Sequence, residues 1–155
     1  MSDKNNPLVS IGVPVFNGEK GLARALDSLI EQDYPNLEII VVDNDSTDDS
    51  ANFIKNNFSE VNLIQSEFNR GFAGGCNVAV KYAKGEYILI INNDTVHEPD
   101  WIEHLVEKIE SNTTIASVQP KIKNFQNREY FDYAGACGGF MDKYCFPFAR
   151  GRIFT

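Results

Sequence analysis

Residues 85–95 read Gly-Glu-Tyr-Ile-Leu-Ile-Ile-Asn-Asn-Asp-Thr, an apolar run that ends abruptly in two amides and a carboxylate. The residues from Tyr87 to Ile91 are aromatic or aliphatic without alternation, which predicts a strand covered on both faces, as in a parallel sheet between layers of helices. Open α/β sheets bind ligands beyond the carboxyl ends of their strands, so Asp94 is a candidate binding residue. The alternative is that the residues around Asp94 only form a turn and cap the next helix.

The length and composition are those of an ordinary globular domain. With 155 residues the chain is near the usual size of one domain, so we expect a single domain over residues 1–155, or part of one. No apolar run approaches the roughly 20 residues that a membrane helix requires, and the polar residues 1–7 lack the apolar core of a secretory signal. We therefore expect a cytoplasmic protein.

The net charge and the cysteines limit which partners and which cellular compartment fit the sequence. The formal net charge of −8 disfavours a nucleic-acid partner, because a phosphate-binding surface needs many Lys and Arg side chains. The three cysteines, Cys76, Cys137 and Cys145, have no CxxC spacing and leave one thiol unpaired in any disulfide scheme, which fits a reducing compartment. We expect packed thiols rather than metal ligands or a nucleophile.

Apolar runs alternate with helical patterns along the first four-fifths of the chain, which predicts a parallel sheet flanked by helices. Strands are expected at residues 8–16, 37–42, 61–65, 87–91 and 115–122. Helices are expected at residues 19–32, from 46 or 47 to 58, at 78–83 and at 99–109. Pro14 has no N–H and should terminate the strand pairing where the first strand ends. Over residues 123–155 the periodicity is lost, and we expect an irregular segment rich in aromatic side chains.

The second apolar run also ends in carboxylates. Asp43 stands where this run stops, and we favour a ligand-binding role for it over a purely structural one. Ser46 or Thr47 is expected to cap the following helix, while Asp48 and Asp49 suit its positive N-terminus.

Residues 69–77 form a glycine-rich segment that leads into a helix, with Arg70 beside Gly71, Gly74 and Gly75. Glycine permits close backbone approach, a helix N-terminus attracts anions and Arg binds phosphate, so this segment suits a diphosphate. The alternative is a flexible connector. The GxGxxG pattern is absent, which disfavours a dinucleotide-binding Rossmann site.

The two histidines have simpler interpretations than catalysis. His97 is expected in the lead-in to the helix that starts near Pro99, and His104 on the solvated side of that helix beside Glu103 and Glu107. Neither histidine is assigned to a site.

Four segments, in this order and spacing, resemble the motifs of family 2 glycosyltransferases, in particular rhamnosyltransferase-like members. They are Val13–Gly18, Ile39–Ser46, Asn69–Asn77 and the triplet Asn92-Asn93-Asp94, which takes the place of the family's DxD motif. The resemblance implies the GT-A fold, a Rossmann-like three-layer α/β/α sandwich with a mostly parallel sheet. It also implies that the chain is the N-terminal, donor-binding portion, with the C-terminal part truncated.

The resemblance further implies a site for a nucleoside diphosphate sugar, UDP- or dTDP-linked, and for a divalent cation, Mn²⁺ or Mg²⁺. Asp94 would bind the cation, which needs only one or two carboxylates when phosphates complete its shell. Asn93 would face the ribose, Asp43 the base, and Arg70 the base or the diphosphate. Asn92 replaces the first acid of a full DxD motif. The residues implied in nucleotide-sugar binding are Pro14, Val15, Phe16, Asn17, Asp43, Asn44, Arg70, Gly71, Gly75, Asn77, Asn92 and Asn93.

The implied activity is an inverting, metal-dependent transfer of the sugar to a glycan or lipid-linked acceptor, as in the synthesis of a surface polysaccharide or a cell wall. No acid after Asp94 stands out as the base, and by the resemblance the base lies beyond Thr155, so we expect this portion to be inactive alone. The full-length protein could associate peripherally with a membrane. The alternative class is a non-catalytic nucleotide-binding domain, or a receiver-like regulatory domain phosphorylated at Asp43.

Overall fold

The computed structural model describes residues 6–130, 139–141, 143 and 147–149. The chain divides into two compact units, Met1–Glu103 and His104–Thr155, and each is considered by itself. The expectation of one domain over the whole chain stays a prediction.

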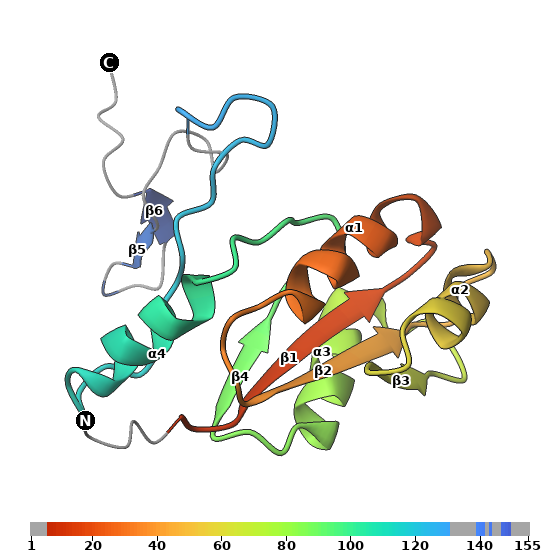
Figure 1. Ribbon diagram of the computed structural model, residues 1–155, viewed down its shortest axis with the longest axis horizontal. Helices are drawn as coiled ribbons and strands as arrows, with labels where there is room; N and C mark the ends of the chain where they lie inside the picture. The colour runs from red at the N-terminus through yellow and green to blue at the C-terminus, as the bar shows by residue number, and fades with distance from the viewer. Residues whose placement is uncertain (1–5, 131–138, 142, 144–146, 150–155) are drawn as a thin grey trace. The chain divides into compact units, whose positions relative to one another are not determined.

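The first unit contains a four-stranded sheet in the order β3-β2-β1-β4, with every pairing parallel (Figure 1). Its strands are β1 Val9–Val15, β2 Leu37–Asp43, β3 Asn62–Gln65 and β4 Tyr87–Ile90. The four apolar runs before residue 92 therefore form the strands that their composition predicts, and the parallel α/β class is confirmed.

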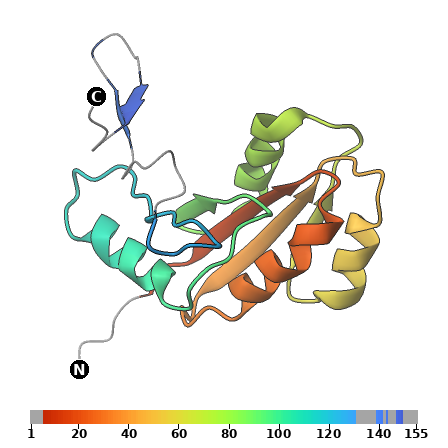
Figure 2. The same ribbon diagram turned by 90° about the horizontal axis from the view of Figure 1, so that it is seen from above.

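Helices cover both faces of this sheet. They are α1 Glu19–Ile30, α2 Ser50–Asn57 and α3 Gly71–Tyr82, while α4 Trp101–Glu110 crosses the boundary between the two units. Figure 2 shows α3 on one face of the sheet and α1 with α2 on the other. The first unit is thus a three-layer α/β/α sandwich.

The core lies between the central strands and the helices. Leu22, Leu26 and Leu29 recur at helical spacing and are all 0% exposed, so α1 buries a single apolar stripe. On the other face α3 approaches closely at Gly12, where an added Cβ would lie only 2.7 Å from the Cβ of Ala79. The two central strands, β1 and β2, are therefore enclosed on both sides.

Pro14 does not terminate the pairing of β1 with β2, contrary to the prediction. The register continues to Val15 opposite Asp43, and Val15 O accepts the Asn44 N–H (2.8 Å). Alternate residues of a strand direct their backbone groups to opposite neighbours, so the missing N–H of Pro14 faces the β4 side. There the last pair is Gly12 with Ile90, and no ladder bond is lost.

The start of β4 is held by a hydrogen-bonded cluster at the amino end of the sheet. The Gly85 N–H donates to Ser10 Oγ (2.7 Å), the Ser10 hydroxyl donates to Glu38, and that carboxylate also accepts the Lys84 N–H (2.6 Å). Burial raises the pKa of Glu38, but the hydrogen bonds from Ser10 and Lys84 outweigh burial and hold the pKa below its usual value. This cluster fixes the strand that delivers residues 92–94 to the opposite end.

The structure contradicts two strand predictions, the coverage of β4 on both faces and the strand at residues 115–122. Ile88 in β4 is 45% exposed, because β4 is the edge strand of the described sheet and is not covered on both faces. Residues 115–122 form no strand, since their apolar pattern finds no ladder partner within the described residues.

In the second unit the described strands are β5 Gly139–Met141 and β6 Pro147–Ala149, which pair antiparallel. Most of the predicted irregular segment at 123–155 lies outside the described residues.

Candidate functional site

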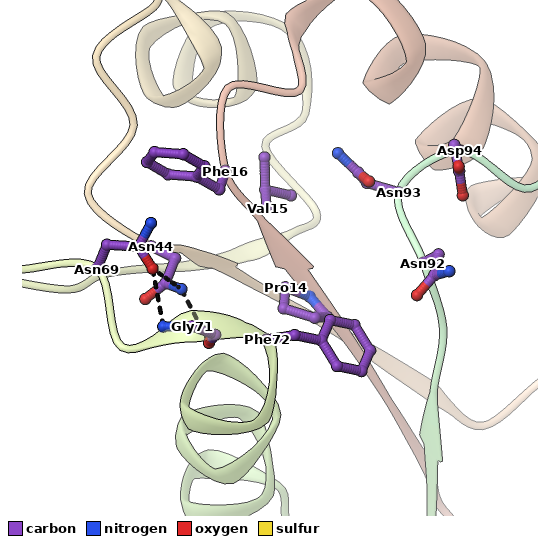
Figure 3. A pocket seen from close by; sticks show the side chains of 10 residues that line it. All are labelled: Pro14, Val15, Phe16, Asn44, Asn69, Gly71, Phe72, Asn92, Asn93 and Asp94. Atoms are coloured by element: carbon purple, nitrogen blue, oxygen red, sulfur yellow. Dashed lines mark hydrogen bonds between the residues drawn. The ribbon is translucent and has the colours of Figure 1, made fainter.

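A cavity of about 340 Å³ lies in the first unit, where β1, β2 and β4 end and α3 begins (Figure 3). Its lining residues are Pro14, Val15, Phe16, Asn44, Asn69, Gly71, Phe72, Asn92, Asn93 and Asp94. All four sequence segments that resemble family motifs contribute to it. This is the carboxyl end of a parallel sheet, where open α/β folds bind their ligands.

One side of the cavity is the Asn44 wall, formed by Asn44, Asn69 and Gly71. The Asn44 side chain is buried, and its Nδ2 donates to Asn69 Oδ1 (2.9 Å) and to Gly71 O (3.0 Å). Its Oδ1 accepts the Arg70 N–H (2.9 Å), and Asn69 Oδ1 accepts the Gly71 N–H (2.8 Å). The start of α3 is therefore tied to the end of β2 by a single amide.

The first loop is held against the loop that follows β2. Asn17 has a φ of 51°, its N–H donates to Ser46 Oγ (3.0 Å), and its Oδ1 accepts the Thr47 N–H (2.8 Å). The Gly18 N–H donates to Ser50 Oγ (3.1 Å). The prediction that Ser46 or Thr47 caps a helix is wrong, because α2 begins at Ser50 and these two side chains bind the Asn17 loop instead.

Asp48 has the structural role that its sequence position suggests. Its carboxylate accepts the Ser50 hydroxyl and N–H and the Glu19 N–H (3.3 Å), which links the first turns of α1 and α2. Burial raises the pKa of Asp48, but these hydrogen bonds outweigh burial and hold the pKa below its usual value.

Asp43 does not line the cavity. The residue is 3% exposed, and its Oδ1 accepts the Ser46 N–H (3.2 Å) in the turn after β2. Its role as a contact to the base stays a prediction. A carboxylate this enclosed is poorly placed for phosphorylation, which argues against the receiver-like alternative.

The other side of the cavity is the Asp94 loop, residues 92–95. In Figure 3 the labelled side chains of Asn92, Asn93 and Asp94 lie across Pro14 and Val15 from the Asn44 wall. The loop lies against the start of α1, because a Cβ added at Gly18 would be 2.2 Å from Asn93 Nδ2.

Asp94 is the one carboxylate among the lining residues. Across the part of the chain that the structure describes, no three His, Cys, Asp or Glu side chains come together as a metal cluster. A hard cation such as Mg²⁺ is nevertheless often held by one or two carboxylates together with waters and substrate phosphates. The donor set at Asp94, a carboxylate beside the amides of Asn92 and Asn93, fits that mode of binding.

Several predicted residues lie beside the cavity without lining it. The Arg70 guanidinium stacks over the Phe68 ring, with Cζ 4.2 Å from the centroid, and Arg70 is the N-cap residue of α3. Gly75 is buried next to Pro14, and Asn77 is exposed on α3. The ligand contacts proposed for Asn17, Arg70, Gly75 and Asn77 stay predictions.

Two lining residues, Asn69 and Phe72, were not predicted. Phe72 is 61% exposed and Phe16 is 49% exposed, so two aromatic rings of the cavity lining are open to solvent. A large apolar residue inside a glycine-rich segment can itself indicate a binding site, because such a segment has few other apolar side chains with which it could form a core.

The remaining candidates agree with their simpler interpretations. His104 has a 69% exposed side chain, and His97 precedes α4. Cys76 is a free, half-buried thiol, and burial raises its pKa, as expected of a packed thiol. Cys137 and Cys145 lie outside the described residues.

The chain matches the model of glycosyl transferase family 2 over residues 10–147. Glycosyltransferase GlyG of Streptococcus pneumoniae is 32% identical over 138 residues, which cover 86% of this chain and 42% of the relative. The UDP-Glc:alpha-D-GlcNAc-diphosphoundecaprenol beta-1,3-glucosyltransferase WfgD of Escherichia coli is 34% identical over 101 residues, which cover 64% of this chain and 38% of the relative.

Solved structures match as well. TarS 1–349 of S. aureus in complex with UDP superposes with a TM-score of 0.61 at 28% identity, covering 76% of this chain and 40% of that one. The mannosyltransferase PcManGT of Pyrobaculum calidifontis, in complex with GDP-Man and Mn²⁺, gives 0.64 at 26% identity, covering 77% and 35%. These matches confirm the GT-A fold class.

The chain spans between 35% and 42% of the length of these two relatives and two solved chains. No helix among the described residues is long and apolar enough to cross a membrane.

Proposed function

This chain is a member of glycosyl transferase family 2, and we propose that it binds the nucleoside diphosphate of a sugar donor in the cavity between the Asn44 wall and the Asp94 loop. The observation that carries the proposal is the convergence of four separate sequence segments on one cavity at the carboxyl end of the sheet. The donor site serves transfer of the sugar to an acceptor hydroxyl.

The two sides of the cavity suit different parts of the donor. The N-terminus of α3 at Gly71 has a partial positive charge that favours the diphosphate, and the exposed Phe16 and Phe72 rings can pack against the base or the sugar. Asn93 would face the ribose. UDP or dTDP is the proposed nucleotide, and the UDP complex of TarS supports the first of these.

Asp94 would hold a divalent cation together with the donor's phosphate oxygens. When bound, such a cation neutralises charge on the departing nucleoside diphosphate. In the transfer the acceptor oxygen bonds to the anomeric carbon, the bond from that carbon to the phosphate oxygen breaks, and a base takes the acceptor's proton. We place that base outside the described residues, and we propose inversion at the anomeric carbon.

A lipid-linked glycan is the proposed acceptor class, by analogy with the diphosphoundecaprenol-linked acceptor in the name of WfgD. Work on such an acceptor fits a cytoplasmic protein that associates peripherally with the membrane and contributes to a surface polysaccharide. Both the acceptor and the location are proposals for the whole protein.

Calorimetric titration tests the donor site directly. UDP, dTDP and GDP are each titrated into the 155-residue chain with Mn²⁺ and again with a chelator. We expect at least one diphosphate to bind, more tightly with Mn²⁺. Asp94→Asn should remove the metal dependence and weaken binding by about tenfold or more, equivalent to about 1.4 kcal/mol.

Asp33→Asn is the matched control, because Asp33 is exposed and does not line the cavity. It removes the same charge and should leave binding unchanged. Absence of metal-dependent binding of all three nucleotides to folded wild-type protein would overturn the proposal.

A further inference from the structure

The imidazole of His97 lies between the Asp94 loop and α1. Its Nε2 is 3.1 Å from Thr95 Oγ1, and its Nδ1 is 3.1 Å from Ser28 Oγ. The backbone N–H of His97 also donates to Ser28 Oγ (3.2 Å). Both ring nitrogens are therefore within hydrogen-bonding distance of a hydroxyl, one on each side.

Both hydroxyls are in turn bound to the backbone. Thr95 Oγ1 donates to Asn92 O (2.9 Å), which closes the Asp94 loop on itself, and Ser28 Oγ donates to Ala25 O (2.9 Å) inside α1. Polar contacts thus run from Ser28 in α1, through His97 and Thr95, to Asn92, where the Asp94 loop begins.

The position of the ring is fixed by its surroundings. His97 stacks on Trp101 with ring centroids 4.9 Å apart and planes at 20°. The following backbone is attached to the end of α1, since Pro99 O accepts the Asp33 N–H (3.0 Å) and Glu98 O accepts Gln32 Nε2 (3.0 Å). These contacts hold the imidazole in one orientation between α1 and the Asp94 loop.

Burial lowers the pKa of His97, so the ring is neutral near pH 7. A neutral imidazole has one donor and one acceptor nitrogen. In the tautomer with its hydrogen on Nε2, the ring donates to Thr95 Oγ1, whose own hydrogen goes to Asn92 O, and Nδ1 accepts the Ser28 hydroxyl hydrogen when that hydrogen turns from Ala25 O to the ring. Within the described residues, by contrast, the side chains of Asn92, Asn93 and Asp94 make no hydrogen bond that would hold the loop. Among the described residues, the side-chain link from the loop to α1 runs through Thr95, His97 and Ser28.

We propose that His97 is a positioning residue: through Thr95 it holds the Asp94 loop in the conformation that directs Asp94 into the cavity. This inference rests on the proposed donor site. It assigns a function-related role to a histidine whose sequence context indicates only a helix lead-in. The effect should fall most on ligands that carry a diphosphate, because the cation proposed at Asp94 would bind phosphate oxygens of that group.

Thr95→Val is the sharpest test, because it keeps the shape of the side chain and removes the hydroxyl. The chain is titrated, in the presence of Mn²⁺, with the nucleoside diphosphate that wild type binds best and with the corresponding monophosphate. We expect diphosphate affinity to fall by about fivefold, the loss of about one hydrogen bond, with monophosphate affinity and the unfolding temperature unchanged. Thr95→Ser, which restores the hydroxyl, should recover the affinity.

Two variants of His97 distinguish the contact made by Nε2 from the contacts made by the whole ring. His97→Gln extends an amide toward the Nε2 position and should retain part of the affinity, while His97→Ala should lose as much as Thr95→Val. His104→Ala and Thr114→Val are matched controls outside the cavity lining, and neither should change binding. Equal losses for diphosphate and monophosphate, or wild-type affinity in Thr95→Val, would overturn the positioning role.

Hydrogen exchange of the unliganded chain gives a readout that does not depend on the donor site. Amides of residues 92–98 should exchange about fivefold faster in Thr95→Val and His97→Ala than in wild type. In His104→Ala they should exchange at the wild-type rate. Unaltered exchange in the first two variants contradicts the inference even if nucleotides bind. If exchange accelerates but wild type binds no nucleotide, the attachment stands, and the donor site and the positioning role are both wrong.

Discussion

The Asn44 wall and the Asp94 loop face the same cavity but are held in different ways. Asn44 is 3% exposed, and its amide makes three hydrogen bonds to the start of α3. The Asp94 loop follows the edge strand β4, and its hydrogen-bonded link to α1 passes through Thr95 and His97. One side of the site is part of the folded core, whereas the other is a loop attached to it.

This difference separates the effects of mutation on stability from those on binding. A substitution in the Asn44 wall removes contacts that join β2 to α3, so unfolding and binding should change together. A substitution at the Asp94 loop leaves the core intact, so binding should change alone. The Asp94 and Thr95 variants are substitutions of the second kind.

Asn44→Ala should have the largest effect. It leaves the Arg70 N–H without its protein partner and removes the bonds from the Asn44 amide to Gly71 O and Asn69 Oδ1, so the free energy of unfolding should fall by about 2–3 kcal/mol. Urea unfolding measures this loss, and nucleotide titration should show that diphosphate and monophosphate binding both weaken. Asn57→Ala is the control, since Asn57 is exposed and donates one bond to Phe53 O. Equal effects of the two variants would show that the Asn44 wall is not part of the stable core.

Gly18→Ala should change binding more than stability. The new Cβ would be 2.2 Å from Asn93 Nδ2, the movable end of a side chain, and 3.0 Å from Val15 Cγ1, so Asn93 swings away and Val15 shifts slightly, at a cost of about 1 kcal/mol. Displacing that amide from the cavity should weaken nucleotide binding several-fold in calorimetry. A loss of stability as large as that of Asn44→Ala would contradict the separation.

Gly21→Ala is the matched substitution one turn further along α1. Its Cβ would meet nothing closer than Asn93 O at 3.5 Å, an ordinary contact. Alanine favours the helix, so the free energy of unfolding should rise by up to about 1 kcal/mol while nucleotide affinity stays constant. Thermal unfolding and nucleotide titration of this variant beside Gly18→Ala decide whether the clash with Asn93 causes the weaker binding of Gly18→Ala.

The smallest effect expected is the pH dependence that His97 confers. Burial places the pKa of the folded state below the unfolded value of 6.5, so below that pH the unfolded chain binds the proton more readily. Stability from this residue is therefore present above pH 6.5 and is lost as the pH falls through the folded pKa. Urea unfolding at several pH values should show a flatter dependence in His97→Gln than in wild type or His104→Gln. If stability depends on pH as steeply in His97→Gln as in wild type, the buried ring does not cause the pH dependence.

Much of this arrangement can be predicted from local sequence. The apolar runs predict β1 to β4 in their correct places, and the polar residues after three of these strands do meet at one end of the sheet. The failed strand at residues 115–122 has the same kind of composition, but a strand forms only where a neighbour completes its ladder. Asn69 was missed because nothing local distinguishes a loop residue that faces a cavity from one that faces solvent. Phe72 was missed because the glycine-rich composition suggests a loop before residue 78, whereas α3 begins at Gly71.

The sequence alone determined the order of βα units and the polar ends of the strands, because both follow from local apolar patterning and chain geometry. Tertiary structure decided which of two adjacent polar residues lines the cavity: Asp43 turns into its own loop, whereas Asn44 faces the cavity. It also decided the role of His97, whose partner Ser28 is 69 positions away in the sequence. Contacts of that kind depend on how packed helices and strands place distant residues, which no local pattern encodes.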